Sequence, residues 1–134
     1  MKIINPIETK TGVPRSMRRG ASWVAKAATT ILSRVKDKHP SVGDVRGIGM
    51  FWAIELVRNR ETRQPYVPFN AAGADAKPMA EIVAFCKQQG LWPFTHFNRM
   101  HVVPPLVITD QDMRDGLAII DEALNVADGY YTGK

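Results

Sequence analysis

Apolar residues recur at helical spacing in the first third of the chain, and the pattern predicts an α-helix over residues 21–38. One stripe repeats every three or four positions, as on a single buried helix face; its members are Val24, Ala28, Ile31, Leu32 and Val35. Pro40 ends the pattern, because the residue before a proline avoids helical backbone angles. Residues 1–20 contain two glycines and two prolines without such a period, so we expect an irregular segment there.

Two further helices are predicted in the second half of the chain. The first covers residues 78–89, and Gly90 is a natural end for it. The second covers residues 110–128, where apolar residues again follow a helical period. Thr109, with Asp112 three residues later, approximates a capping box, in which side chains bind the free N–H groups of a first helical turn.

Strands are predicted between these helices. Residues 42–57 read as two strands, because Gly47 and Gly49 allow a tight reversal or a bulge between them. Residues 91–97 and 100–103 read as two shorter strands around an Asn-Arg turn. Helices that alternate with such strand pairs indicate an α+β fold, a two-layer domain with helices packed on one side of a small, mainly antiparallel sheet.

Length and composition agree with a single domain. The chain has 134 residues, of which 45% are hydrophobic and 23% charged, as in an ordinary globular domain. The net charge of +5 is uneven: residues 1–39 contain nine basic and two acidic residues, against nine and eleven in residues 40–134. No nucleic-acid-binding motif accompanies the basic segment and no apolar run is long enough to span a membrane, so we expect neither kind of partner.

Cysteine and histidine usage adds little chemistry. The single Cys86 excludes an internal disulfide and favours a reducing compartment, so we expect a cytoplasmic protein. It falls on the apolar side of its predicted helix, where a packed thiol is expected. His39, His96 and His101 lack the spacing and neighbouring acids of a metal site, and we assign no metal ligand.

The most specific stretch runs from residue 96 to residue 109. Pro104 and Pro105 cannot donate hydrogen bonds to a sheet, so they end the strand before them. Arg99 is therefore held close to a rigid corner, where a charged side chain can be presented to a ligand. Residues two apart in a strand share a face, so Arg99 and His101 point the same way.

Four stretches together resemble the C-terminal small domain of class III pyridoxal-phosphate aminotransferases, of the ω-amino-acid–pyruvate kind. They are HPSVGDVRGIGMFWAIEL from His39, KQQGL from Lys87, VPPLVIT from Val103 and GLAIIDEAL from Gly116. They occur in the family's order, which is more specific than any single motif. The resemblance implies that residues 21–134 form that small domain of a fold-type I enzyme, preceded by residues 1–20 as a basic segment.

The resemblance also implies transamination, in which an amino group passes from an ω-amino acid or amine to an oxo acid such as pyruvate. Pyridoxal phosphate carries the electron-sink chemistry in the intact enzyme. The family's Schiff-base lysine and cofactor cradle belong to a large domain, so we assign no catalytic or cofactor-binding residue here. We expect a fragment that needs a large domain or a homodimer partner and is inactive in isolation. The alternative is a non-catalytic remnant or a subunit-association module.

The candidate substrate-binding residues are Arg99 and His101. Many family members place an arginine three residues before the first paired proline, where its guanidinium binds a substrate carboxylate through two parallel hydrogen bonds. That position is His101 here, a departure from the pattern. Arg99, on the same strand face, has a longer side chain that could replace it as a carboxylate or sulfonate clamp. The alternative is that Arg99 is a surface residue in a hairpin turn.

Overall fold

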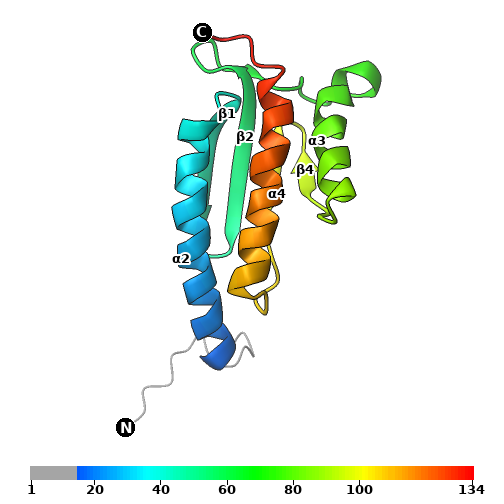
Figure 1. The fold of residues 1–134 in the computed structure, drawn as a ribbon. Helices are drawn as coiled ribbons and strands as arrows, with labels where there is room; N and C mark the ends of the chain where they lie inside the picture. The colour runs from blue at the N-terminus through cyan, green and yellow to red at the C-terminus, as the bar shows by residue number, and fades with distance from the viewer. Residues whose placement is uncertain (1–14) are drawn as a thin grey trace.

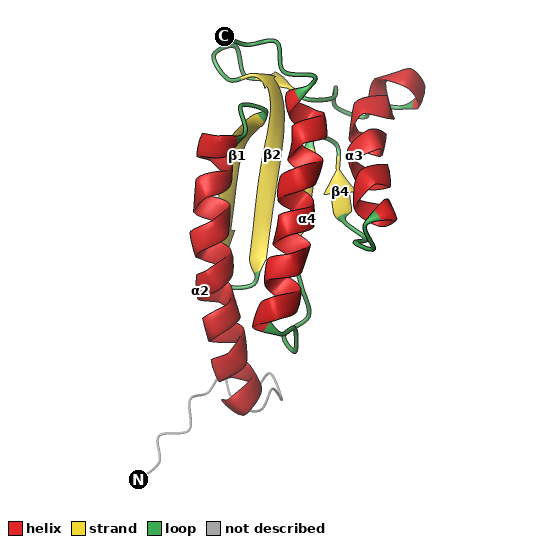
Figure 2. Cartoon of the chain, viewed as in Figure 1, coloured by secondary structure: helices red, strands yellow, loops and turns green. Residues whose placement is uncertain are grey.

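The structure is a computed structural model that describes the backbone of residues 15–134 and the side chains of residues 23–134. Three helices lie on one side of an antiparallel sheet (Figures 1 and 2). The elements are α2 (Arg15–Lys38), β1 (Val42–Ile48), β2 (Phe51–Asn59), β3 (Gln64–Pro65), η1 (Gly73–Ala76), α3 (Lys77–Gln88), β4 (Phe94–His96), β5 (Arg99–Val102) and α4 (Asp110–Asp128). This arrangement confirms the predicted α+β two-layer fold.

The sheet has the strand order β1-β2-β5-β4, and β3 pairs with the end of β2. All of these pairs are antiparallel. β2 and β5 are neighbours although 39 residues separate the end of one from the start of the other, and the segment between them contains α3. The register places Ala53 of β2 between Arg46 of β1 and His101 of β5, so the two basic side chains share one face of the sheet.

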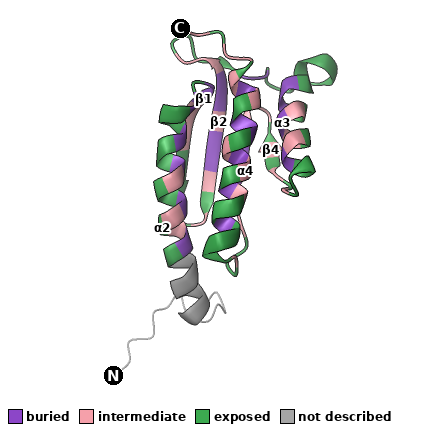
Figure 3. Ribbon diagram, in the orientation of Figure 1, coloured by how far each residue is buried: buried purple, intermediate pink, exposed green. Residues whose placement is uncertain are grey.

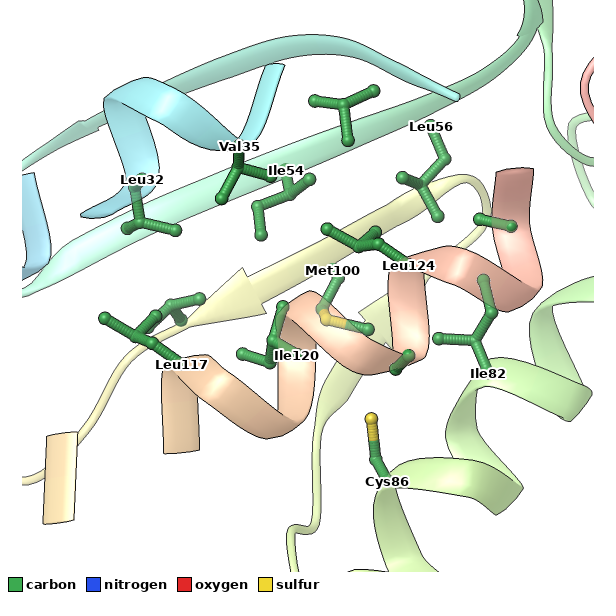
Figure 4. Packing of buried hydrophobic residues seen from close by; sticks show 14 of the residues in the cluster. Leu32, Val35, Ile54, Leu56, Ile82, Cys86, Met100, Leu117, Ile120 and Leu124 are labelled. Carbon is green, nitrogen blue, oxygen red and sulfur yellow. The ribbon is translucent and has the colours of Figure 1, made fainter. Parts of the chain in front are cut away.

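The hydrophobic core lies between the sheet and the helices. Alternate residues of the central strands point toward the helices and are buried, among them Ile54 and Leu56 of β2 and Met100 of β5. They pack against Leu32 and Val35 of α2, Ile82 and Cys86 of α3, and Leu117, Ile120 and Leu124 of α4 (Figure 4). The buried stripe of α4 faces the sheet along its length (Figure 3). Burial of each such aliphatic side chain contributes about 1.5–3 kcal/mol.

The end of α2 is fastened to the rest of the domain from two directions. His39 is 1% exposed, and its two ring nitrogens contact Asp121 and Asp128 of α4. From the other side, the guanidinium of Arg60 donates to the carbonyl oxygens of His39 at 2.6 Å and Val42 at 3.1 Å. The turn between α2 and β1 is therefore held by side chains that follow it in the sequence.

The first helix begins earlier than predicted. α2 starts at Arg15 and continues through Gly20, so the expectation of an irregular segment is wrong for residues 15–20. An internal glycine costs a helix about 1 kcal/mol, and the helix-favouring residues on both sides of it outweigh that cost. The remainder of that expectation, residues 1–14, lies outside the described residues.

The other boundaries agree with the predictions to within a few residues. α3 and α4 match their predicted ranges closely. The side chain of Thr109 accepts a 3.0 Å hydrogen bond from the backbone N–H of Asp112, as the capping box predicts. The second hairpin differs, because its turn is Phe97-Asn98 and Arg99 is already the first residue of β5. Arg99 is thus a strand residue rather than a turn residue.

Candidate functional site

One face of the sheet is not covered by any helix in the described part of the chain. Side chains alternate along a strand, so the residues that do not point toward the core must point to this opposite face. We call it the uncovered face. Its residues are Asp44, Arg46 and Ile48 of β1, Phe51, Ala53 and Glu55 of β2, Phe94 and His96 of β4, and Arg99 and His101 of β5.

The uncovered face is divided into an apolar and a charged part. Ile48, Phe51 and Phe94 lie toward one end, and their side chains are 82%, 55% and 66% exposed. The charged part, which includes Glu55 and Arg99, lies farther along the same strands. Large apolar side chains left in water are typical of a surface that binds another molecule. Phe51 therefore belongs to the exposed apolar part of the strand rather than to the core.

Arg99 carries a positive charge that no described carboxylate neutralises. It lies directly across from Glu55 of β2 on one side and from His96 of β4 on the other. Its Nη2 atom donates a hydrogen bond to Nδ1 of His96 at 3.1 Å. Among the residues that the structure describes, Arg99 forms no ion pair. Its guanidinium therefore retains both its charge and most of its five N–H donors.

Arg46, in contrast to Arg99, is paired with two carboxylates. Its Nη2 atom donates to Oε2 of Glu55 at 2.8 Å, and its Nη1 atom donates to Oδ2 of Asp44 at 2.7 Å. The hydrogen bond from Arg46 lowers the pKa of the Asp44 carboxyl below its ordinary value, against a smaller opposing effect of burial. The pairing of Arg46 with Glu55 occupies the carboxylate that lies directly across the sheet from Arg99.

His101 lies between two aromatic rings. Its ring centroid is 6.1 Å from that of Phe51 and 5.2 Å from that of Phe94. Burial lowers the pKa of His101 below its ordinary value, and the nearby positive charge of Arg99 lowers it further. The imidazole is consequently neutral near pH 7, where it can donate one hydrogen bond and accept another but offers little charge to an anion.

Two separate hollows open beside these residues. One, of about 200 Å³, is lined by Arg99 and Glu55 together with Val67, Phe69 and Phe97. The other, of about 300 Å³, is lined by His101 with Trp92, Phe94, Val103 and Pro105. The predicted pair therefore shares a face, as expected, but each residue lines its own hollow. Arg99 and His101 can contact the same ligand only if the Arg99 side chain extends from its own hollow toward that of His101.

Neither of the two hollows beside Arg99 and His101 could hold pyridoxal phosphate as a Schiff base with a described lysine. Neither hollow is lined by a lysine, so no amine stands beside Arg99 or His101 to hold the cofactor as a Schiff base. Lys87, on α3, lies over the ring of Trp92 instead, 4.5 Å from its centroid. No cluster of potential metal ligands occurs in the described part of the chain, and no described helix is long and apolar enough to cross a membrane.

Sequence reasoning missed two features of the site. The contact between His96 and Arg99 depends on the register of β4 and β5, which no local pattern specifies. The aromatic flanks of His101 are Phe51 and Phe94, which lie on different strands and 43 positions apart in the sequence. Alternation along each strand gives the correct face for every one of these residues, but only the pairing shows which of them are neighbours.

The fold and the uncovered face define a small α+β domain that presents Arg99, without a described carboxylate partner, on an open sheet, and comparison with known proteins gives its family. The family profile described as "Aminotransferase class-III" matches residues 3–124. The chain belongs to the class III aminotransferase family, which confirms the resemblance seen in its motifs.

Individual relatives cover most of this chain but only a part of their own length. The 4-aminobutyrate aminotransferase GabT of Escherichia coli is 36% identical over 99 residues, 72% of this chain and 21% of the relative. The taurine–pyruvate aminotransferase of Bilophila wadsworthia is 33% identical over 94 residues, 68% of this chain and 20% of the relative. This chain thus spans about a fifth of the length of these curated relatives.

A solved structure shows the same fold. The taurine:2-oxoglutarate aminotransferase of Bifidobacterium kashiwanohense, in complex with PLP and glutamate, superposes with a TM-score of 0.76. The match covers 92% of this chain and 26% of that one, at 24% identity. The fold-type I assignment of the domain follows from this likeness.

Proposed function

We propose that this chain acts as the small domain of a pyridoxal-phosphate-dependent aminotransferase, which transfers an amino group from an ω-amino acid or amine to an oxo acid such as pyruvate. The uncovered face would form one wall of the substrate pocket. The observation that carries the proposal is the unneutralised guanidinium of Arg99 on an open sheet face. Family membership supplies the reaction class. Two relatives are named for 4-aminobutyrate and for taurine, and both of these amino donors contain an acid group.

Each residue of the uncovered face would have a distinct task. Arg99 binds the carboxylate or sulfonate of the substrate, because a guanidinium presents two parallel N–H donors that match two acid oxygens. His101, neutral near pH 7, orients the substrate by hydrogen bonding rather than by charge. Phe51 and Phe94 flank it and exclude water, which strengthens the polar contacts beside them.

The remaining parts of the active site would lie outside these 134 residues. The lysine that binds pyridoxal phosphate and the phosphate cradle are assigned to a large domain or to the partner subunit of a homodimer. The exposed apolar side chains of Ile48, Phe51 and Phe94 support such an association, since their burial would contribute favourably. The chain alone is expected to be inactive. We place the assembly in the cytoplasm, which the free and buried Cys86 supports.

A transaminase assay tests this proposal. The chain is mixed with pyridoxal phosphate, first alone and then with a class III large domain that contains the Schiff-base lysine. We expect no cofactor absorbance shift and no turnover from the chain alone, and turnover when both are present. A Schiff base at one lysine of the isolated chain, with turnover, would contradict the division of tasks.

The apolar part of the uncovered face also favours a second candidate, a non-catalytic module that only associates with a partner subunit. The same assay separates the two candidates. A chain that binds the large domain but leaves its activity unchanged is an association module. A chain that is required for turnover of acidic donors is part of the enzyme.

A further inference from the structure

We propose that His96 is a positioning residue for Arg99: its ring accepts a hydrogen bond that keeps the guanidinium away from Glu55 and available to an anion. This inference rests on the proposed function, because it concerns the same arginine. It explains why an arginine with an acidic neighbour in the sheet keeps its charge unpaired.

Arg99 has two direct cross-strand neighbours of different chemistry. Glu55 lies opposite it on β2, and His96 lies opposite it on β4. Opposite charges at such positions attract one another across a sheet. Yet the observed bond of Arg99 is with the imidazole, 3.1 Å from Nη2 to Nδ1, and the carboxylate of Glu55 binds Arg46 instead. The competition for the arginine is thus resolved in favour of a neutral partner.

The ring of His96 is held in the orientation that this bond requires. It packs against Phe97 with ring centroids 4.0 Å apart, and Phe97 packs against Phe69 at 4.6 Å. Phe97 occupies the hairpin turn with a φ of 54°, and its ring contacts both His96 and Phe69. A guanidinium can only donate, so Nδ1 of His96 must accept and its proton must reside on Nε2.

The choice of partner decides what Arg99 can do. A carboxylate would neutralise the guanidinium, whereas a neutral imidazole occupies one N–H and leaves the positive charge in place. The remaining donors can then bind both oxygens of a carboxylate or sulfonate. If the acceptor is lost, Glu55 is the nearest alternative partner across the sheet, and Arg99 would compete with Arg46 for it.

The test uses methanesulfonate as an anionic probe and the Arg99 side-chain signals in NMR spectra of the 134-residue chain. His96→Phe removes the acceptor but retains an aromatic ring, and His96→Asn retains an acceptor close to the position of Nδ1. We expect His96→Phe to weaken probe binding about three- to tenfold, the effect of one such hydrogen bond. His96→Asn should stay within about twofold of the unmodified chain.

A double-mutant cycle with Glu55→Gln identifies the competing partner. In the Glu55→Gln background, His96→Phe should weaken binding by less than about twofold, because no carboxylate remains to capture Arg99. His96→Ala serves as a second acceptor-free variant if the phenylalanine disturbs the strand in the spectra.

The outcomes separate this inference from the proposed function. If the unmodified chain shows no saturable shift at Arg99, the anion clamp itself is wrong, and a positioning role for His96 is wrong with it. If the unmodified chain binds and His96→Phe binds equally well, or loses the same affinity in both backgrounds, the clamp stands and the positioning role is overturned.

Discussion

The Nδ1 atom of His39 lies 2.6 Å from Oδ2 of Asp128, and this contact joins the end of α2 to the last residue of α4. The second ring nitrogen lies 2.9 Å from Oδ1 of Asp121, two helical turns earlier on α4. Ser41 adds a bond from its hydroxyl to Asp128 at 2.6 Å. One buried ring therefore fixes how the first and last helices pack.

Replacement of His39 by alanine should destabilise the domain. The change leaves two partly buried carboxylates without their shared partner, and we expect the free energy of unfolding to fall by about 2–4 kcal/mol. Urea denaturation followed by circular dichroism measures this. The matched control is Asp37→Ala, an exposed residue near the end of α2, which should change stability by less than about 0.5 kcal/mol. Equal effects of the two substitutions would contradict a stabilising role for the contact of His39 with Asp121 and Asp128.

Asp121 should make the stability of the domain depend on pH on the acid side. Burial alone would raise the pKa of its carboxyl, but hydrogen bonds from Lys38 and His39 outweigh it, and the net pKa is lowered. A carboxyl group with a lowered pKa contributes its full stabilisation when the pH is above the group's ordinary pKa. That contribution is lost as the pH falls through the lowered pKa. Asp121→Asn should therefore reduce stability at pH 6 and flatten its decline below pH 4. The free energy of unfolding is measured by urea denaturation at each pH. If it declines below pH 4 in Asp121→Asn as it does in the unmodified chain, Asp121 does not have this role.

His101 should contribute more to anion binding in acid than at neutral pH. Its pKa is lowered by burial and by nearby positive charges, so its positive charge develops only as pH falls below the ordinary histidine range near 6.5. In the assembled enzyme, His101→Ala should raise the KM of an acidic donor modestly at pH 8, where only a neutral hydrogen bond is lost, and more strongly at pH 5.5.

The matched substitution at the same position is His101→Arg, which supplies a permanent charge. It should lower that KM about tenfold at both pH values, since a charge-assisted hydrogen bond contributes about 1.5 kcal/mol. A KM that does not respond to either substitution at any pH would show that the substrate does not reach this hollow.

The sequence allowed the helices and their buried faces to be predicted because these depend on local periodicity. The apolar stripe of α4 and the cap at Thr109 are local features, and both are present in the structure. α2 begins at Arg15, earlier than the glycines and prolines of residues 1–20 indicate, because a single internal Gly20 does not end a helix whose neighbours favour it. The turn at Phe97 was missed because a bulky residue with positive φ is uncommon.

The site was predictable only in part. Alternation along one strand was enough to place Arg99 and His101 on the same face. Their surroundings depend on strand pairing, which joins distant segments and has no local signal. Asn98 illustrates this: its side chain and its carbonyl both bind the backbone of Leu56, at 3.0 and 2.8 Å. These bonds hold β5 beside β2 and so bring Glu55 next to Arg99.

The substrate preference of an Arg99→Ala variant tests the central claim most directly. In the assembled enzyme, steady-state kinetics are measured with taurine as an acidic donor and with a simple neutral amine. Loss of the paired, charge-assisted hydrogen bonds should lower kcat/KM for taurine by about one to two powers of ten. The neutral amine makes no such contact, and its kcat/KM should stay within about twofold. Equal losses on both donors would show that Arg99 only supports the strand, and the assignment of the clamp would be wrong.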